Sequence, residues 1–307
     1  MQKTLKKSFS FSGVCLHSGN NTNVTVHPAP ANTGIKFKRV DLDTESEEKV
    51  IDAIIQNVVA SQLCTTIQNN FGNKVSTIEH LMSAFYGLGI DNVLIDIDTD
   101  EIPILDGSSK IFLDLIDEAG IKNLKVPHKI FKIMRPIMVG NKESFIKITP
   151  NESYSIDYTI SYNNTFLGDQ RLTLESFNEI MYRELISNSR TFGFKKDIDM
   201  LLQKGLIKGG SLNNAILVDD NGIVNEGELR YPDEFVRHKI LDFIGDMFLL
   251  GKRVQGHFEI FCGGHGLTQE LLKTLISDQS NWKLIDENLS NIGQRSTKSH
   301  TEISAAI

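Results

Sequence analysis

Alternating apolar and polar positions mark strands along much of the chain. The stretches Asn23–His27 and Gly34–Val40 alternate or carry β-branched residues, and prolines between them predict a turn. Further strands are expected over Asn92–Ile97, Ile130–Ile133, Ser144–Ile148, Tyr154–Tyr162 and His257–Phe261. Strands therefore dominate the first third of the chain and return in the second half.

Helical spacing of apolar residues appears between these strands. A helix is expected from Ser76, because Ser76 and Glu79 have the spacing of a capping box, and Gly87 supplies a stop. A long helix is expected after a cap at Asp233 and before a stop at Gly251. The remaining long helices are expected over Ser109–Ala119 and Thr268–Ile276.

The same order of elements occurs in both halves of the chain. Each half runs from strands to a helix that carries a histidine, then to a strand, a loop with glycine and another helix. We place the boundary near Pro127, so that one domain spans residues 1–126 and the other 127–307. The expected fold class is α+β, a two-domain sandwich in which each domain packs a β-sheet on helices. Such packing would place the two histidine helices in one cleft.

The second half carries extra material at about residues 194–231. A short helix over Lys196–Lys204 precedes the hairpin signal Asp220-Asn221-Gly222, which predicts a βαβ-like insertion. Its apolar side chains include Leu201, Leu202, Leu206 and Ile207. They either cover a groove for an apolar ligand or form a small core of the insertion itself, and the sequence does not separate the two.

Charge and cysteine usage narrow the class of partner. The 307 residues carry a net charge of −7, which argues against nucleic acid as the main partner but leaves room for a local basic pocket. Three cysteines, Cys15, Cys64 and Cys262, form neither a disulfide framework nor a C-x-x-C pair, so we expect a cytoplasmic protein. No apolar run has the length of a signal peptide core or of a transmembrane segment. We expect a monomer.

Candidate metal ligands occur on the two histidine helices. His238 and Asp242 lie one helical turn apart, so both can reach one ion. Zinc accepts imidazole nitrogen and carboxylate oxygen, and its catalytic sites use three protein ligands. His80 on the earlier helix is the candidate third ligand. The plainer alternative is that His238 and Asp242 form an ordinary surface pair and that His80 is a core histidine.

Three further residues could perform acid–base or electrostatic chemistry near such a metal. Glu79 points about 100° away from His80 on a helix, so it can take a proton from water, or it merely closes the capping box. His265 lies in the glycine-rich segment Gly263–Gly266, where it can protonate a leaving amine, or it is a turn residue without a task. Thr191 can donate to an oxyanion, or it is an ordinary strand threonine.

Four motifs in chain order carry a family resemblance. They are Ser76–Asn92 (STIEHLMSAFYGLGIDN), Arg190–Phe194 (RTFGF), Phe235–Asp246 (FVRHKILDFIGD) and Gly263–Leu267 (GGHGL). Together they closely resemble the UDP-3-O-acyl-N-acetylglucosamine deacetylases of lipid A biosynthesis. The N-terminal SFSFSGVCLHSG and the segment Leu63–Thr66 (LCTT) are similar to the opening of that family. The resemblance covers roughly residues 1–285, and the tail from Asp286 has no counterpart.

The resemblance implies zinc as the cofactor and a role for each matching residue. His80, His238 and Asp242 match the zinc ligands. Glu79 matches the general base, and His265 matches the general acid.

Supporting and substrate-binding residues are implied in the same way. Thr191 matches the residue that stabilises the oxyanion, and Asp246 matches the carboxylate that orients the catalytic histidine. The matching substrate contacts are Lys239, Phe192 and, in a loose alignment, Lys142, together with Leu201, Leu206 and Ile207 of an acyl-chain passage.

The implied reaction is removal of acetate from the 2-amino group of UDP-3-O-acyl-N-acetylglucosamine, a small-molecule lipidic substrate. Two other functions are compatible with the residues alone. One is a zinc amidase that acts on another N-acyl sugar. The other is a metal-stabilised binding protein without catalysis, although such a protein has no need of both Glu79 and His265.

Overall fold

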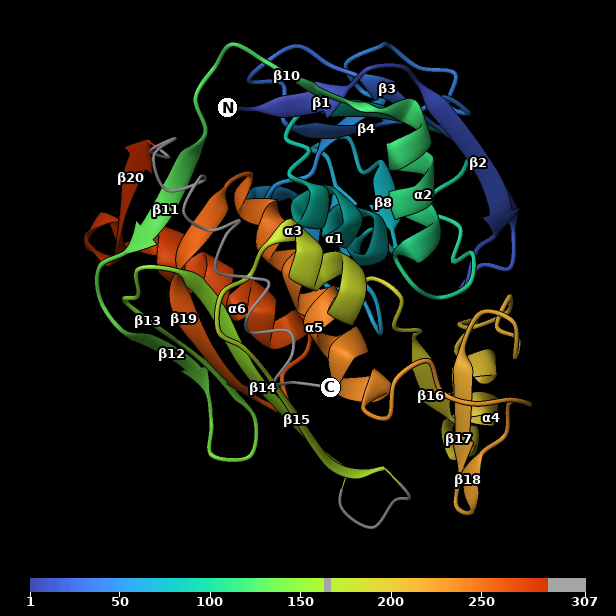
Figure 1. Cartoon of the computed structure of the whole chain (residues 1–307). Helices are drawn as coiled ribbons and strands as arrows, with labels where there is room; N and C mark the ends of the chain where they lie inside the picture. The colour runs from blue at the N-terminus through green and yellow to red at the C-terminus, as the bar shows by residue number, and fades with distance from the viewer. Residues whose placement is uncertain (163–166, 287–307) are drawn as a thin grey trace.

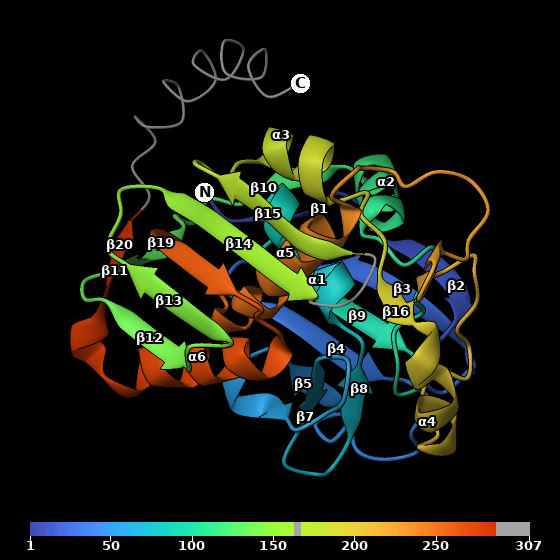
Figure 2. The same ribbon diagram turned by 90° about the horizontal axis from the view of Figure 1, so that it is seen from below.

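The computed structural model describes residues 1–162 and 167–286. Most helices lie between two β-sheets, and a small insertion projects from one end of the molecule (Figures 1 and 2). The tail that begins at Asp286 lies outside the described residues from 287 onward. Within the described ranges, no helix combines the length and the apolar character that crossing a membrane requires.

The first sheet is formed by N-terminal strands in the order β2-β3-β9-β4-β5. Only β4 and β9 pair in parallel, and the other neighbours are antiparallel. The bounds are β2 (Phe9–Val14), β3 (Asn21–Pro28), β4 (Ile35–Arg39), β5 (Val50–Asp52) and β9 (Val93–Ile97). In β3 every second residue is buried, which confirms the alternation seen in the sequence.

Two smaller sheets accompany the first one. β1 (Lys3–Leu5) pairs with β10 (Ile121–Asn123), and β6 (Val58–Val59), β7 (Thr66–Gln68) and β8 (Lys74–Ser76) form an antiparallel sheet of three strands. β8 leads directly into α1, so this small sheet fixes where that helix begins.

The second sheet has seven strands and is built around β19 (Arg253–Phe261). β19 is antiparallel to β13 and parallel to β11 and β14. The other members are β11 (Lys129–Ile133), β12 (Ile137–Gly140), β13 (Phe145–Thr149), β14 (Tyr154–Tyr162), β15 (Gly168–Leu174) and β20 (Trp282–Asp286). The expected α+β sandwich of sheets and helices is confirmed, and the boundary near Pro127 stays a prediction.

Helices α1 and α5 pack on each other between the two sheets. The helices are α1 (Glu79–Leu88), α2 (Lys110–Ala119), α3 (Glu179–Met181), α5 (Glu234–Met247) and α6 (His265–Ser277). Every residue of α1 is buried, whereas α2 buries one face only. A helix that is buried all round lies inside the protein, where its polar side chains require specific partners.

The capping box expected at the start of α1 is wrong. Ser76 belongs to β8, where it pairs with Thr66, and Ile78 precedes the first helical residue without any side-chain cap. The carboxylate of Glu79 is therefore not used as a cap, and it instead accepts the backbone N–H of Thr65 at 3.1 Å. The helix also continues past Gly87 and ends at Leu88, where the following Gly89 adopts a left-handed φ of 73°.

The ends of the other two site helices also differ from expectation. Asp233 does not cap α5, because its carboxylate accepts a hydrogen bond from Arg237 instead. A 3-10 turn, Phe248–Leu250, follows α5 before the left-handed Gly251, which ends the helical segment as expected. α6 begins at His265, so this histidine is the first helical residue and not a loop residue.

The insertion forms the expected βαβ unit. β16 (Phe192–Phe194) pairs in parallel with β17 (Ile216–Asp219), and α4 (Ile198–Gln203) lies between them in the chain. β18 (Gly222–Ile223) then returns antiparallel to β17. Figures 1 and 2 show this unit at the edge of the molecule, beside the end of the α1–α5 pair.

A close approach of backbones defines the crossing of α1 and α5. A Cβ atom added at Gly245 would lie 2.0 Å from the carbonyl oxygen of Glu79. Real side chains never come that close to a backbone oxygen, so only glycine fits at this position of α5. The two helices could not otherwise bring their polar residues into one cluster.

We therefore expect Gly245→Ala to destabilise the protein. Overpacking at a buried contact costs about 1–3 kcal/mol, and here the obstacle is backbone that cannot rotate away. Urea unfolding of the variant and of the wild type measures the difference. Gly266→Ala is the control, because Gly266 is also helical but has no atom within 4 Å of an added Cβ. Equal stability of Gly245→Ala and the wild type would contradict the packing argument.

Candidate active site

A metal-ligand group lies where α1 and α5 cross. His80 of α1 and His238 and Asp242 of α5 each offer one ligand atom, and these atoms all lie within 4.8 Å of one another. Nε2 of His80 and Nε2 of His238 lie 3.4 and 3.3 Å from Oδ1 of Asp242. Among the described residues this is the one such group of histidine, cysteine or carboxylate side chains. The helical spacing of His238 and Asp242 therefore does place both on one face, and the third member comes from the other half of the chain.

The chemical state of these side chains fits a divalent cation. Oδ1 of Asp242 is buried without a hydrogen-bond partner, which is costly unless a cation compensates. Nδ1 of His238 lies 3.2 Å from the carbonyl oxygen of Ser189, so it carries the proton and leaves the Nε2 lone pair facing Asp242. Burial lowers the pKa of His238 to about 3, which keeps the imidazole in its neutral, ligating form.

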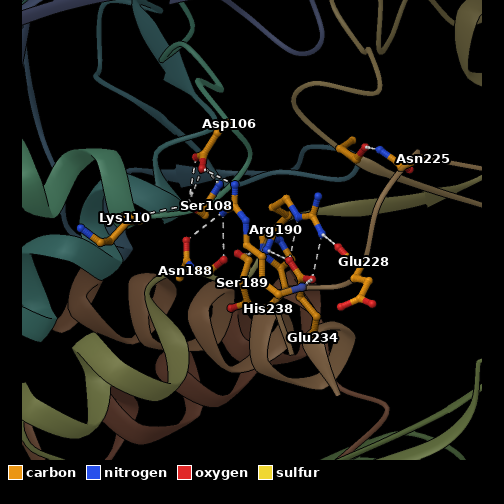
Figure 3. Close-up of polar contacts among 12 residues, drawn as sticks. Asp106, Ser108, Lys110, Asn188, Ser189, Arg190, Asn225, Glu228, Glu234 and His238 are labelled. Atoms are coloured by element: carbon orange, nitrogen blue, oxygen red, sulfur yellow. Dashed lines mark hydrogen bonds and ion pairs between the residues drawn. The ribbon is translucent and has the colours of Figure 1, made fainter. Parts of the chain in front are cut away.

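The loop that contains Ser189, the hydrogen-bond partner of His238, is anchored by the ion pair between Arg190 and Glu234. Glu234 is fully buried and accepts hydrogen bonds from the Arg190 side chain at 2.8 and 3.0 Å and from its backbone N–H at 2.9 Å. Figure 3 shows this pair beside Ser189 and His238. The same anchoring positions Thr191, whose backbone N–H and carbonyl are bonded to Gly107 and Ile216. No motif or spacing in the sequence pointed to Ser189 or to the partner of Arg190.

Glu79, His265 and Asp246 form a second cluster next to the metal-ligand group. Nε2 of His265 lies 3.7 Å from Oε1 of Glu79, and Nδ1 lies 2.7 Å from Oδ2 of Asp246. Burial raises the pKa of Glu79. Burial opposes charge on His265 as well, but the carboxylate of Asp246 outweighs it and raises the pKa of His265 to about 9. The arrangement pairs a carboxylate that can accept a proton with an imidazolium that can donate one.

Lys239 borders the metal-ligand group on the other side. Its Nζ lies 2.9 Å from Oδ2 of Asp242 and 5.6 Å from the ring centre of Phe192. Burial disfavours the ammonium form, yet attraction to Asp242 outweighs it and raises the pKa of Lys239. The charged form of Lys239 is thus favoured beside the cavity, near the ring of Phe192.

A cavity of about 810 Å³ connects these groups with the insertion. At one end it is lined by Glu79, His80, Thr191, Phe192, His238, Lys239, Asp242 and His265. At the other end the lining is mostly apolar and comes from Ile198, Leu201, Leu202, Ile207, Ala215 and Leu217. The insertion therefore covers an apolar groove, which was one of the two alternatives left open by the sequence.

Two of the expected substrate contacts do not line this cavity. Leu206 belongs to the insertion but is not among the lining residues. Lys142 is exposed in the turn between β12 and β13 and is also outside the lining. Asp246 lies behind His265 and reaches the cavity only through that imidazole.

Two further buried residues, His17 and Thr65, belong to the site although no motif assigned them a role. His17 lines the cavity, and neither of its ring nitrogens has a hydrogen-bond partner. Thr65 donates its hydroxyl proton to Asp246 across a separation of 181 residues. Both lie in segments that carried the family resemblance, yet neither has a spacing relative to the metal ligands that could have predicted its contacts.

Comparison with known proteins places the whole chain in one family. The model of the LpxC family, described as UDP-3-O-acyl N-acetylglycosamine deacetylase, matches residues 2–277. A protein of Lawsonia intracellularis is 41% identical over 312 residues, covering 100% of this chain and 99% of that protein. A protein of Idiomarina loihiensis is 41% identical over 285 residues, covering 92% of each. Both relatives are named UDP-3-O-acyl-N-acetylglucosamine deacetylase. The chain is a member of the LpxC family of deacetylases.

Proposed function

We propose that this chain hydrolyses the acetamide of UDP-3-O-acyl-N-acetylglucosamine to acetate and a free amine, a step of lipid A biosynthesis. The observation that carries the proposal is the contact between a buried metal-ligand group, a buried carboxylate and a charged imidazole at one end of an apolar cavity. Relatives that match almost the whole chain are named for this reaction.

Zinc is the proposed metal. Two imidazole nitrogens and one carboxylate oxygen are a ligand set typical of catalytic zinc, and His80, His238 and Asp242 would supply them. When bound, zinc supplies a Lewis acid that polarises the amide carbonyl and makes a water molecule more acidic.

The proposed proton transfers use Glu79 and His265. Glu79 takes a proton from the attacking water, whose oxygen bonds to the acetamide carbon. His265 then gives its Nε2 proton to the 2-amino nitrogen as the carbon–nitrogen bond breaks. Asp246 accepts the Nδ1–H of His265 and favours the charged imidazole. Thr191 faces the cavity, and its hydroxyl is proposed to donate to the oxyanion that forms on the carbonyl oxygen.

Substrate binding is proposed to divide between the two ends of the cavity. Lys239 and Phe192 would contact the sugar nucleotide next to the metal-ligand group, because a buried cation suits an anionic or polar substrate group. Leu201 and Ile207 would contact the acyl chain. A contact of Lys142 or Leu206 with substrate stays a prediction.

The proposed location is the cytoplasm. Cys15, Cys64 and Cys262 are all free thiols, and two of them are buried. Free thiols in this number support a reducing compartment, where disulfides rarely form.

Two variants should separate metal binding from proton transfer. We expect about one zinc per chain in the wild type, most of it lost in His238→Ala, because that imidazole is a ligand. Glu79→Gln should keep its metal and lose roughly 10²–10⁴-fold in acetate release, since an amide cannot act as the base. Elemental analysis measures the zinc content, and mass spectrometry measures acetate release. His27→Ala is the control, because His27 lies on β3 and belongs neither to the metal-ligand group nor to the cavity lining. A fully loaded His238→Ala, or a fully active Glu79→Gln, would contradict the assigned roles.

The rate of acetate release should have a bell-shaped dependence on pH, with an acidic and a basic limb. Activity falls at low pH as Glu79 is protonated, and it falls at high pH as His265, with a pKa of about 9, loses its proton. Asp246→Asn removes the charge that raises this pKa, so the basic limb should move from about 9 toward the ordinary 6.5. Profiles of kcat against pH test this, with Asp114→Asn on the surface of α2 as the control. A basic limb that does not move would show that Asp246 leaves the imidazole unaffected.

Catalytic efficiency should rise with the length of the 3-O-acyl chain. Each buried methylene contributes about 0.8 kcal/mol, or roughly fourfold in binding. Ala215 lines the apolar end, so Ala215→Phe should reduce kcat/KM for long chains before short ones. Met200→Phe is the matched control, because Met200 belongs to α4 of the same insertion but is exposed and does not line the cavity. A flat dependence on chain length in the wild type would argue for another N-acyl sugar as substrate.

A further inference from the structure

Thr65 lies fully buried between the two halves of the candidate active site. It directly precedes β7. Two residues before it, Leu63 adopts a positive φ of 64°, which is rare for leucine. This turn directs Thr65 toward α1 and α5 and away from solvent. A residue held in this way contacts the catalytic groups without being able to contact bulk water.

The Thr65 hydroxyl bridges Asp246 and His265. Oγ1 lies 2.5 Å from Oδ1 of Asp246 and 3.2 Å from Nδ1 of His265. An ionised carboxylate only accepts hydrogen bonds, so the single hydroxyl proton of Thr65 points to Asp246. The oxygen of Thr65 can then only accept from His265, which requires a proton on Nδ1. Thr65 and Asp246 together therefore hold that proton on Nδ1 and leave Nε2 facing Glu79.

The backbone of the same residue contacts the proposed base. The N–H of Thr65 donates to Oε2 of Glu79 at 3.1 Å. The other carboxylate oxygen, Oε1, lies on the side of His265 Nε2 at 3.7 Å. Thr65 thus determines which oxygen of Glu79 is bonded to the protein and which faces the imidazole. Glu79 and His265, the proposed base and acid, both contact Thr65.

We propose that Thr65 is a positioning residue that sets the geometry of Glu79 relative to His265 through its N–H and its hydroxyl. The proposal rests on the proposed function, because it presupposes that Glu79 and His265 transfer protons. Thr65 does not line the substrate cavity, so it acts on the reaction and not on substrate binding. Loss of the hydroxyl should therefore lower kcat while KM and metal content stay constant.

The neighbouring Thr66 provides a matched control. It is also buried, but its hydroxyl donates to Ser76 at 3.1 Å and has no contact with Glu79, Asp246 or His265. Thr65→Val and Thr66→Val each remove one buried hydroxyl from adjacent positions. Thr65→Ser keeps the hydroxyl, and Thr65→Ala is a second variant without it in case valine does not fold.

The experiment measures kcat, KM, zinc content and unfolding temperature for these four variants on the acylated UDP-sugar. Thr65→Val should lose roughly 10- to 100-fold in kcat, the usual effect of removing a partner that orients an active-site group. Thr65→Ser should retain most of the activity, and Thr66→Val should retain kcat even if its stability falls.

Three results would overturn the proposal: Thr65→Val as active as the wild type, Thr65→Ser as impaired as Thr65→Val, or an equal loss of kcat in Thr66→Val. Glu79→Gln in the same assay distinguishes a wrong role for Thr65 from a wrong proposed function. If Glu79→Gln is inactive while Thr65→Val is unaffected, only the role of Thr65 is wrong. If Glu79→Gln is fully active, both proposals are wrong.

Discussion

The backbone contact between α1 and α5 is the constraint on which the site depends. Gly245 lets the carbonyl of Glu79 approach α5 to a distance that no other residue would permit. His80 then faces His238 and Asp242, and Glu79 is brought beside the last turns of α5. Proteins transmit small displacements through packed interiors because they are as dense as crystals. A larger residue at 245 would therefore change the relative position of every group at this crossing.

Burial gives these groups their chemical properties, and neighbouring charges decide which state each adopts. Desolvation alone lowers the pKa of His238, His265 and Lys239 and so favours their neutral forms. His238 stays neutral, as its proposed role as a metal ligand requires, whereas Asp246 and Asp242 favour the charged forms of His265 and Lys239. His238 and His265 thus differ in protonation because their Nδ1 atoms have different partners. Nδ1 of His238 faces the backbone carbonyl of Ser189, whereas Nδ1 of His265 faces the buried carboxylate of Asp246.

The proposed chemistry and the proposed acyl-chain specificity are assigned to different parts of the fold. The candidate metal ligands and the proposed proton-transfer residues lie on helices packed between two sheets, which hold them rigidly. The apolar end of the cavity is built by the βαβ insertion at the edge of the molecule. This arrangement allows the insertion to vary with the acyl chain while the catalytic geometry is preserved.

Local patterns in the sequence determined strands such as β3, β9 and β14 and placed His238 and Asp242 on one face of a helix, because these features depend on periods of two or about four residues. The turn signal Asp220-Asn221-Gly222 marked the hairpin of the insertion. The tertiary structure alone decided that His80 joins His238 and Asp242, since it comes from another helix. It also decided that Glu79 accepts from Thr65 and does not cap its helix. The bridge from Thr65 to Asp246 spans 181 residues, a separation at which no periodicity relates two positions. Such contacts are set by how α1, α5 and the segment before β7 pack together, and the sequence specifies that packing only through the whole core.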